Sequence, residues 1–210
     1  MNDTRTAYLD SYRALSVLAA APKLTERWHS ESALADFSVR GLAGHLIVRT
    51  GRAVLDYLDA DLPAGASPVD GPRYYATVLG RMDAAEHEQV RVRGEAAAPD
   101  GPEGLLASYE GALEGLARLD EEPPDRLVHV YGGIVLRLDD YLVTRICEIL
   151  IHADDLAVSL ELDPLDFPQA AWDLALEHLL AVARMTHGDR AVLMGFSRRE
   201  RDPGNALRVF

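Results

Sequence analysis

The chain has 210 residues, of which 48% are hydrophobic, and a formal net charge of −13. This length is enough for one well-filled domain, and the apolar content is ordinary for a globular protein. The acidic balance argues against a nucleic-acid partner, because proteins that bind nucleic acids present a basic face to the phosphates. No run approaches the roughly 20 apolar residues of a membrane helix, so we expect no membrane association.

The cysteine content and the N-terminus both favour the cytoplasm. Cys147 is the only cysteine, so no internal disulfide can form, which fits a reducing compartment. The first residues, MNDTRTAYLDSYRAL, carry charges where a signal peptide has its apolar segment. We therefore expect a cytoplasmic protein. Its oligomeric state, monomer or homodimer, does not follow from these features.

The spacing of apolar residues predicts a mainly α protein. Hydrophobic side chains recur three and four positions apart, and breaks rich in proline, glycine or acidic residues are expected at 59–71, 94–102 and 121–125. Ser38 is a suitable N-cap for the second helix, and residues 23–37 before it are expected to form a loop. The predicted helices span residues 4–21, 38–60, 74–92, 105–119, 139–162, 167–187 and 191–199.

Two segments fall outside this helical pattern. Residues 126–138, RLVHVYGGIVLRL, contain two β-branched runs around Gly132 and Gly133, which is typical of a tight β-hairpin. An isolated hairpin is marginally stable, so we expect it to lie on the helices. The tail, residues 201–210, is expected either to drape over the surface or to be disordered.

A candidate metal site lies in residues 141–162, YLVTRICEILIHADDLAVSLEL, where Glu148 and His152 form E-x-x-x-H. Positions four apart share one face of an α-helix, so both side chains can reach one cation. The many apolar neighbours indicate that this face points inward, where an unpaired charge is costly. His45, in the similarly apolar segment VRGLAGHLIVRT, is the candidate third ligand. Two histidines and a carboxylate suit zinc or another divalent first-row metal, and they leave positions open for water or substrate.

The same pattern has other interpretations. E-x-x-x-H also occurs in helices as a solvated pair that binds no metal. A bundle of this kind could be non-catalytic and keep a metal for stability or bind a small ligand, although a structural zinc is closed by four protein ligands. In a third interpretation, Glu148 acts as a base without any metal.

The two motifs together resemble a known family. VRGLAGHL, followed far downstream by E-x-x-x-H-x-x-D at residues 148–155, is similar to the mycothiol-dependent maleylpyruvate isomerase family, of the N-terminal-domain type, in the DinB-like superfamily of four-helix-bundle metalloenzymes. The likeness covers residues 4–162. It implies a DinB-like four-helix bundle over residues 1–162, with the short hairpin, and extra C-terminal helices over residues 163–210 packed on that bundle as one domain.

The resemblance also implies a chemistry. It suggests a divalent metal, zinc first and nickel second, held by His45, Glu148 and His152, and the low-molecular-weight thiol mycothiol as cofactor or co-substrate. In the implied mechanism the metal holds the sulfur as a thiolate, which adds to an electrophilic carbon of a small substrate. Release of the thiol then gives isomerisation, and its retention gives an S-conjugate. The expected function is therefore a thiol-dependent isomerase or S-transferase.

The chain departs from the family pattern at two points. Many relatives carry a separate C-terminal α/β domain that contributes to the active site, whereas residues 163–210 here indicate a helix and a tail. The aromatic residue usual between the motif histidine and aspartate is replaced by Asp154. These differences leave open which thiol and which substrate the bundle would use.

Three charged neighbours of the motifs are candidate catalytic residues. Asp155 follows His152 by three positions and could orient that histidine by a hydrogen bond, or pair with Arg49 instead. Arg49 and Arg145 are expected to face the bundle centre, where an arginine can bind a substrate carboxylate or neutralise a buried acid. Cys147 is expected to pack in the core. The remaining candidates for packing or surface positions are His29, His87, His129, His178, His187, Tyr8, Tyr12, Tyr74, Tyr75 and Tyr109.

Overall fold

The computed structural model describes residues 3–98, 100–197, 200, 204 and 207–209. Over these residues the fold is mainly α with one two-stranded antiparallel sheet, as the apolar spacing predicts. The elements are α1 (Asp3–Ala14), α2 (Ser16–Ala19), α3 (Pro22–Glu26), α4 (Val39–Ala43), η1 (Gly44–Arg49), α5 (Thr50–Asp59), α6 (Gly71–Leu79), α7 (Ala84–Ala97), α8 (Gly101–Gly115), η2 (Leu116–Asp120), β1 (Leu127–Val130), η3 (Tyr131–Gly133), β2 (Ile134–Arg137), α9 (Leu138–Ser159), α10 (Gln169–His187) and α11 (Asp189–Ser197).

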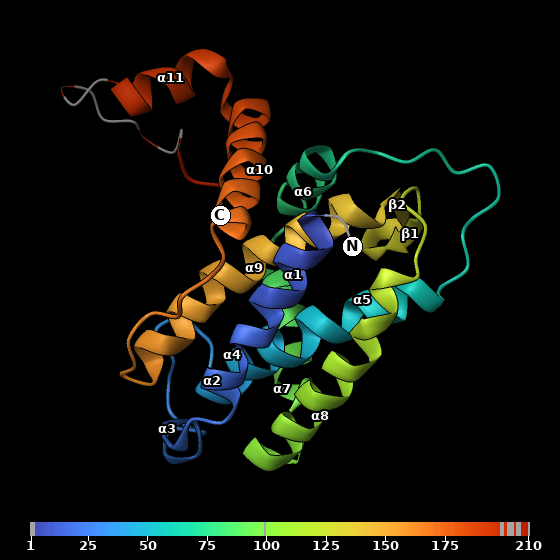
Figure 1. The fold of residues 1–210 in the computed structure, drawn as a ribbon. Coiled ribbons are helices and arrows are strands. Elements are labelled where there is room, and N and C mark those ends of the chain that lie inside the picture. Colours follow the sequence, from blue (N-terminus) through green and yellow to red (C-terminus); the bar gives the residue numbers. More distant parts are fainter. Residues whose placement is uncertain (1–2, 99, 198–199, 201–203, 205–206, 210) are drawn as a thin grey trace.

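Four helical stretches enclose the main core: α1 with α2, the run α4–η1–α5, α8, and α9 (Figure 1). Helix α1 packs along α9, and α8 packs against η1, α5 and α2. Each stretch contributes fully buried leucines, for example Leu15, Leu46, Leu105 and Leu142. Burying one such side chain contributes about 1.5–3 kcal/mol, so the apolar spacing of the four stretches accounts for their assembly.

The run predicted as one helix over residues 38–60 is continuous but not uniform. Ser38 is the N-cap, and its hydroxyl oxygen accepts a hydrogen bond from the Gly41 amide at 2.9 Å. The middle of the run, η1, is a π-helix. Two buried tyrosines of α1 bind carbonyl groups of this run. Tyr12 donates to the Ile47 oxygen of η1 at 2.8 Å, and Tyr8 donates to the Thr50 oxygen at the start of α5 at 3.0 Å. A π-helical segment inside an α-helix is often a mark of a functional site.

The single helix predicted over residues 74–92 is wrong. Two helices, α6 and α7, occupy this region, and Asp83 starts the second by accepting hydrogen bonds from the amides of Ala85 and Glu86. Helix α7 also runs past Gly94, which was expected to begin a break. Gly94 lies where α7 crosses α4, and a Cβ there would meet the Gly41 carbonyl oxygen at 2.4 Å. The glycine therefore marks a close contact between helices and not a helix end.

The hairpin is confirmed, with a longer connection than expected. Strands β1 and β2 pair in antiparallel register from Leu127 with Arg137 to Val130 with Ile134. Three residues, Tyr131–Gly133, join them, and both glycines have positive φ, 79° at Gly132 and 73° at Gly133. The hairpin lies against α5, α6 and α9, so it is supported by the helices as predicted.

Residues beyond the bundle form two further helices. Helix α10 packs on α9, α6 and α1, and α11 follows it with its main contacts to α10 (Figure 1). Most of the predicted 201–210 tail lies outside the described residues, as do the last two positions of the helix predicted over 191–199. The predicted 23–37 loop contains the short helix α3, which begins at Pro22. None of the helices in the described part of the chain has both the length and the apolar character of a membrane span.

Candidate metal centre

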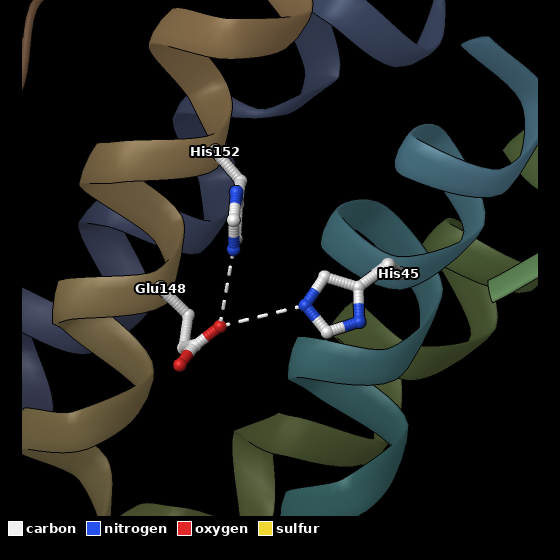
Figure 2. A group of neighbouring side chains, drawn as sticks. All are labelled: His45, Glu148 and His152. Carbon is white, nitrogen blue, oxygen red and sulfur yellow. Dashed lines mark hydrogen bonds and ion pairs between the residues drawn. The ribbon is translucent and has the colours of Figure 1, made fainter. Parts of the chain in front are cut away.

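The three predicted ligands lie together between two helices of the bundle. His45 projects from η1, and Glu148 and His152 project from α9 toward it (Figure 2). The Glu148 Oε2 atom is 3.4 Å from the Nε2 atom of His45 and 3.4 Å from that of His152. The three side chains are between 14% and 19% exposed, so solvent can reach the cluster.

These distances suit a small divalent cation. Zinc bonds of 2.0–2.2 Å in tetrahedral geometry separate neighbouring ligand atoms by about 3.3 Å. Both Nε2–Oε2 separations are close to that value, and one ligand atom from each residue lies within 4.8 Å of the others. No fourth histidine, cysteine or acidic residue of the described chain joins the group. The donor set therefore fits a cation with three protein ligands and open positions.

The charge states of Glu148 and His45 favour cation binding. Burial, the largest influence, raises the pKa of Glu148, but hydrogen bonds with His152 and His45 outweigh it and hold that pKa well below its usual range. The carboxylate is thus ionised, as a metal ligand must be. Burial lowers the pKa of His45 and so favours the neutral imidazole that can bind a metal. The low pKa of Glu148 also makes it a poor base, which argues against metal-free catalysis by this residue.

Asp155 orients one of the histidines. Its Oδ2 atom lies 3.0 Å from His152 Nδ1, which leaves the Nε2 atom directed at Glu148. Against the effect of burial, Asp155 and Glu148 raise the pKa of His152 to about 9. The alternative pairing of Asp155 with Arg49 is not seen among the described ion pairs. This arrangement is the carboxylate–histidine contact commonly found behind a metal ligand.

The two candidate arginines have different surroundings. Arg145 lies over the Tyr141 ring, 5.0 Å from its centre, and its Nη2 atom is 3.9 Å from Glu148 Oε1. Burial lowers the pKa of Arg145, but Tyr141 and Glu148 together outweigh burial and raise this pKa above its usual value, so the guanidinium stays charged. Arg49 is half-buried and has no carboxylate partner among the described ion pairs. It lines a surface hollow of about 280 Å³ together with Arg52 and Arg93.

Sequence reasoning missed two residues of the site, Tyr75 and His178. The Tyr75 hydroxyl donates a hydrogen bond of 2.8 Å to Glu148 Oε1, and its ring lies 5.3 Å from the His178 ring. His178 is 5% exposed, and its Nε2 atom has no hydrogen-bond partner among the described residues. Tyr75 lies 73 positions from Glu148 in a different helix, so no periodic signal could connect them. Cys147, by contrast, is buried as predicted, and burial raises its pKa to about 12.

Comparison with known proteins identifies the family of the chain. The family model of the mycothiol maleylpyruvate isomerase N-terminal domain matches residues 9–157, a span that contains His45, Glu148, His152 and Asp155. The chain belongs to this family. The resemblance expected from the two motifs is thereby confirmed.

One solved structure supports the fold of this family member. The crystal structure of the mycothiol-dependent maleylpyruvate isomerase is similar with a TM-score of 0.55 and 15% sequence identity. The match covers 90% of this chain and 71% of the other. At this identity the likeness shows a common fold, which extends beyond the family domain into the C-terminal helices. No curated protein matches the sequence.

Proposed function

We propose that the protein is a divalent-metal-dependent enzyme that uses a low-molecular-weight thiol, mycothiol in the first instance, as an isomerase or S-transferase for a small electrophilic substrate. The observation that carries the proposal is the convergence of His45, Glu148 and His152, with no fourth ligand beside them among the described residues. A structural zinc is closed by four protein ligands, so three favour a catalytic centre. Family membership supports the thiol and the reaction class.

His45, Glu148 and His152 would hold the cation, with zinc preferred and nickel second. A divalent cation bound there lowers the pKa of a thiol or water in contact with it, because its charge stabilises the anion. Asp155 holds the His152 ring so that Nε2 faces the centre. Arg145 keeps positive charge beside Glu148, and Arg49 is available for an anionic group of the substrate.

Residues 163–210 are proposed to belong to the same domain. Helix α10 packs on α9, which carries two of the candidate ligands, and on α6, which carries Tyr75. In this proposal, α10 forms an outer wall of the site by covering α9 and α6. It would do so without a separate α/β domain.

The test is metal content followed by thiol chemistry. Protein purified without added metal is expected to contain about one zinc or nickel per chain, and His45→Ala and His152→Ala are expected to lose it. His129→Ala, on strand β1, is the matched control and should keep its metal. Mycothiol-dependent conversion of electrophilic substrates is measured as consumption of the thiol or as formation of the isomer. This activity should disappear when the metal is removed. Wild-type protein without divalent metal, or triad variants with unchanged activity, would contradict the proposal.

A further inference from the structure

The two oxygens of Glu148 have separate partners. Oε2 lies 3.4 Å from each histidine Nε2 atom and is the oxygen that a shared cation would contact. Oε1 accepts the Tyr75 hydroxyl at 2.8 Å, and Arg145 lies 3.9 Å from the same oxygen. The carboxylate is therefore divided, with one oxygen toward the histidines and one toward a phenol and a guanidinium.

Tyr75 is held in place by the fold. It lies on α6, which starts at the N-cap Asp70, and its side chain is 2% exposed. The His178 ring of α10 packs against the Tyr75 ring, with 5.3 Å between ring centres, and Glu148 of α9 accepts a hydrogen bond from the Tyr75 hydroxyl. Three helices thus determine where the phenol oxygen lies, so the hydrogen bond to Oε1 is part of the core.

The bond of Tyr75 restricts how Glu148 can bind a cation. The terminal torsion of a glutamate is broad and nearly two-fold, so an unrestrained carboxylate can present one oxygen or both. Hydrogen-bond partners of this kind orient ligating carboxylates in metal sites. A hydroxyl that holds Oε1 at 2.8 Å therefore keeps this oxygen turned toward α6 and leaves Oε2 facing the histidines. A carboxylate that binds through one oxygen occupies one position only.

We infer that Tyr75 is a positioning residue that keeps Glu148 a one-oxygen ligand and so leaves a coordination position free for thiol, water or substrate. This inference rests on the proposed metal centre. Arg145 supports the same orientation by its charge. Tyr75 itself would not contact the cation, so its effect would appear in how Glu148 coordinates that cation.

The experiment compares three full-length proteins stripped of metal: wild type, Tyr75→Phe and Tyr109→Phe. Tyr109 is the matched control, since its hydroxyl also donates within the core, to the Arg13 carbonyl oxygen at 3.0 Å, but away from the site. Zinc affinity is measured by competition with a chromophoric chelator. The visible absorption of the cobalt(II) protein reports coordination number, because four-coordinate cobalt absorbs more strongly than five- or six-coordinate cobalt. Thermal melts without metal measure any general loss of stability.

We expect Tyr75→Phe to bind zinc roughly 10- to 100-fold more weakly, because Glu148 loses a partner that orients its carboxylate. The cobalt bands should also be weaker, as both oxygens of Glu148 approach the cation. Tyr109→Phe should match wild type in both metal readouts, even if its melting temperature falls as much. If the cobalt spectrum of Tyr75→Phe is unchanged, the inference fails whatever the zinc affinity, and the proposed function stands. It also fails if Tyr109→Phe shows the same changes. Wild-type protein that binds neither metal would overturn both.

Discussion

Glu148 and His178 are both buried near Tyr75, but their surroundings stabilise opposite charge states. Glu148 has two histidines, a phenol and an arginine around its carboxylate, and these partners keep it ionised in spite of burial. His178 has no hydrogen-bond partner for Nε2 among the described residues, and burial lowers its pKa to about 4. A buried group without a partner is neutral, whereas a buried group with several partners can carry charge.

This difference predicts a pH dependence of stability at His178. Its pKa is depressed from 6.5 to about 4 by burial and by Arg145, against the opposing effect of Asp70. Between these values the unfolded chain binds more protons than the native protein, so the free energy of unfolding rises as pH increases from 4 to 6.5. The full contribution of His178 to the free energy of unfolding is roughly 3 kcal/mol, and it is present at pH values above the pKa of this histidine in the unfolded chain.

The measurement is chemical denaturation at several pH values for wild type and His178→Phe. The variant should lose this part of the pH slope, so the difference in stability between the two proteins should change across the interval. Parallel curves over the whole range would contradict the prediction, whatever the absolute stability of the variant.

At the scale of elements, the site depends on how closely α7 approaches the helix that carries His45. A Cβ on Gly94 would lie 2.4 Å from the Gly41 carbonyl oxygen, and one on Gly44 would lie 2.1 Å from the Gly94 carbonyl oxygen. Only glycine allows these two backbones to approach so closely. The π-helical segment η1 lies at this crossing, which links the position of His45 to the packing of α7.

Gly94→Ala should therefore separate the two helices and destabilise the protein. Overpacking of this kind typically costs about 1–3 kcal/mol, which denaturant unfolding can measure. Gly111→Ala is the control, because Gly111 lies in α8 and a Cβ added there would meet no described atom within 4 Å. There alanine should be neutral or stabilising by up to about 1 kcal/mol, since it is the better helix former. Equal effects of the two changes would contradict a tight crossing at Gly94.

At the scale of the whole molecule, the candidate ligands connect parts of the chain that are far apart in sequence. His45 and Glu148 are separated by 103 positions, and α10 packs on the helix that carries Glu148 and His152. A ligand that binds only the native protein raises the free energy of unfolding of every part that unfolds with it. Zinc can therefore report whether residues 163–210 and the bundle form one unit.

We expect a single thermal transition that shifts upward as a whole when zinc is added. At a free zinc concentration 100 times the dissociation constant, the gain is about 2.7 kcal/mol. Calorimetry with and without zinc checks both points, and His152→Ala should show one transition without the shift. A second transition that does not respond to zinc would indicate that the C-terminal extension unfolds separately and would contradict the one-domain proposal.

Local features of the chain were predictable because they depend on neighbours in sequence. The apolar spacing predicts most helices, Ser38 marks a true N-cap, and the β-branched runs around Gly132 and Gly133 form the hairpin. The four-residue separation of Glu148 and His152 puts both on one face of α9, which helix geometry alone requires. The order of the two motifs was enough to indicate the family.

Other features were decided by contacts between distant segments. The continuation of α7 through Gly94 follows from a helix crossing that no local pattern encodes. The same holds for the hydrogen bond from Tyr75 to Glu148 and for the burial of His178, since each joins separate helices. The break between α6 and α7, by contrast, has a local signal in the N-cap Asp83, which the apolar spacing alone did not reveal. Periodicity identifies which face of a helix is buried. Only the packed structure determines which side chain of another helix that face meets, because many arrangements of helices bury the same apolar residues.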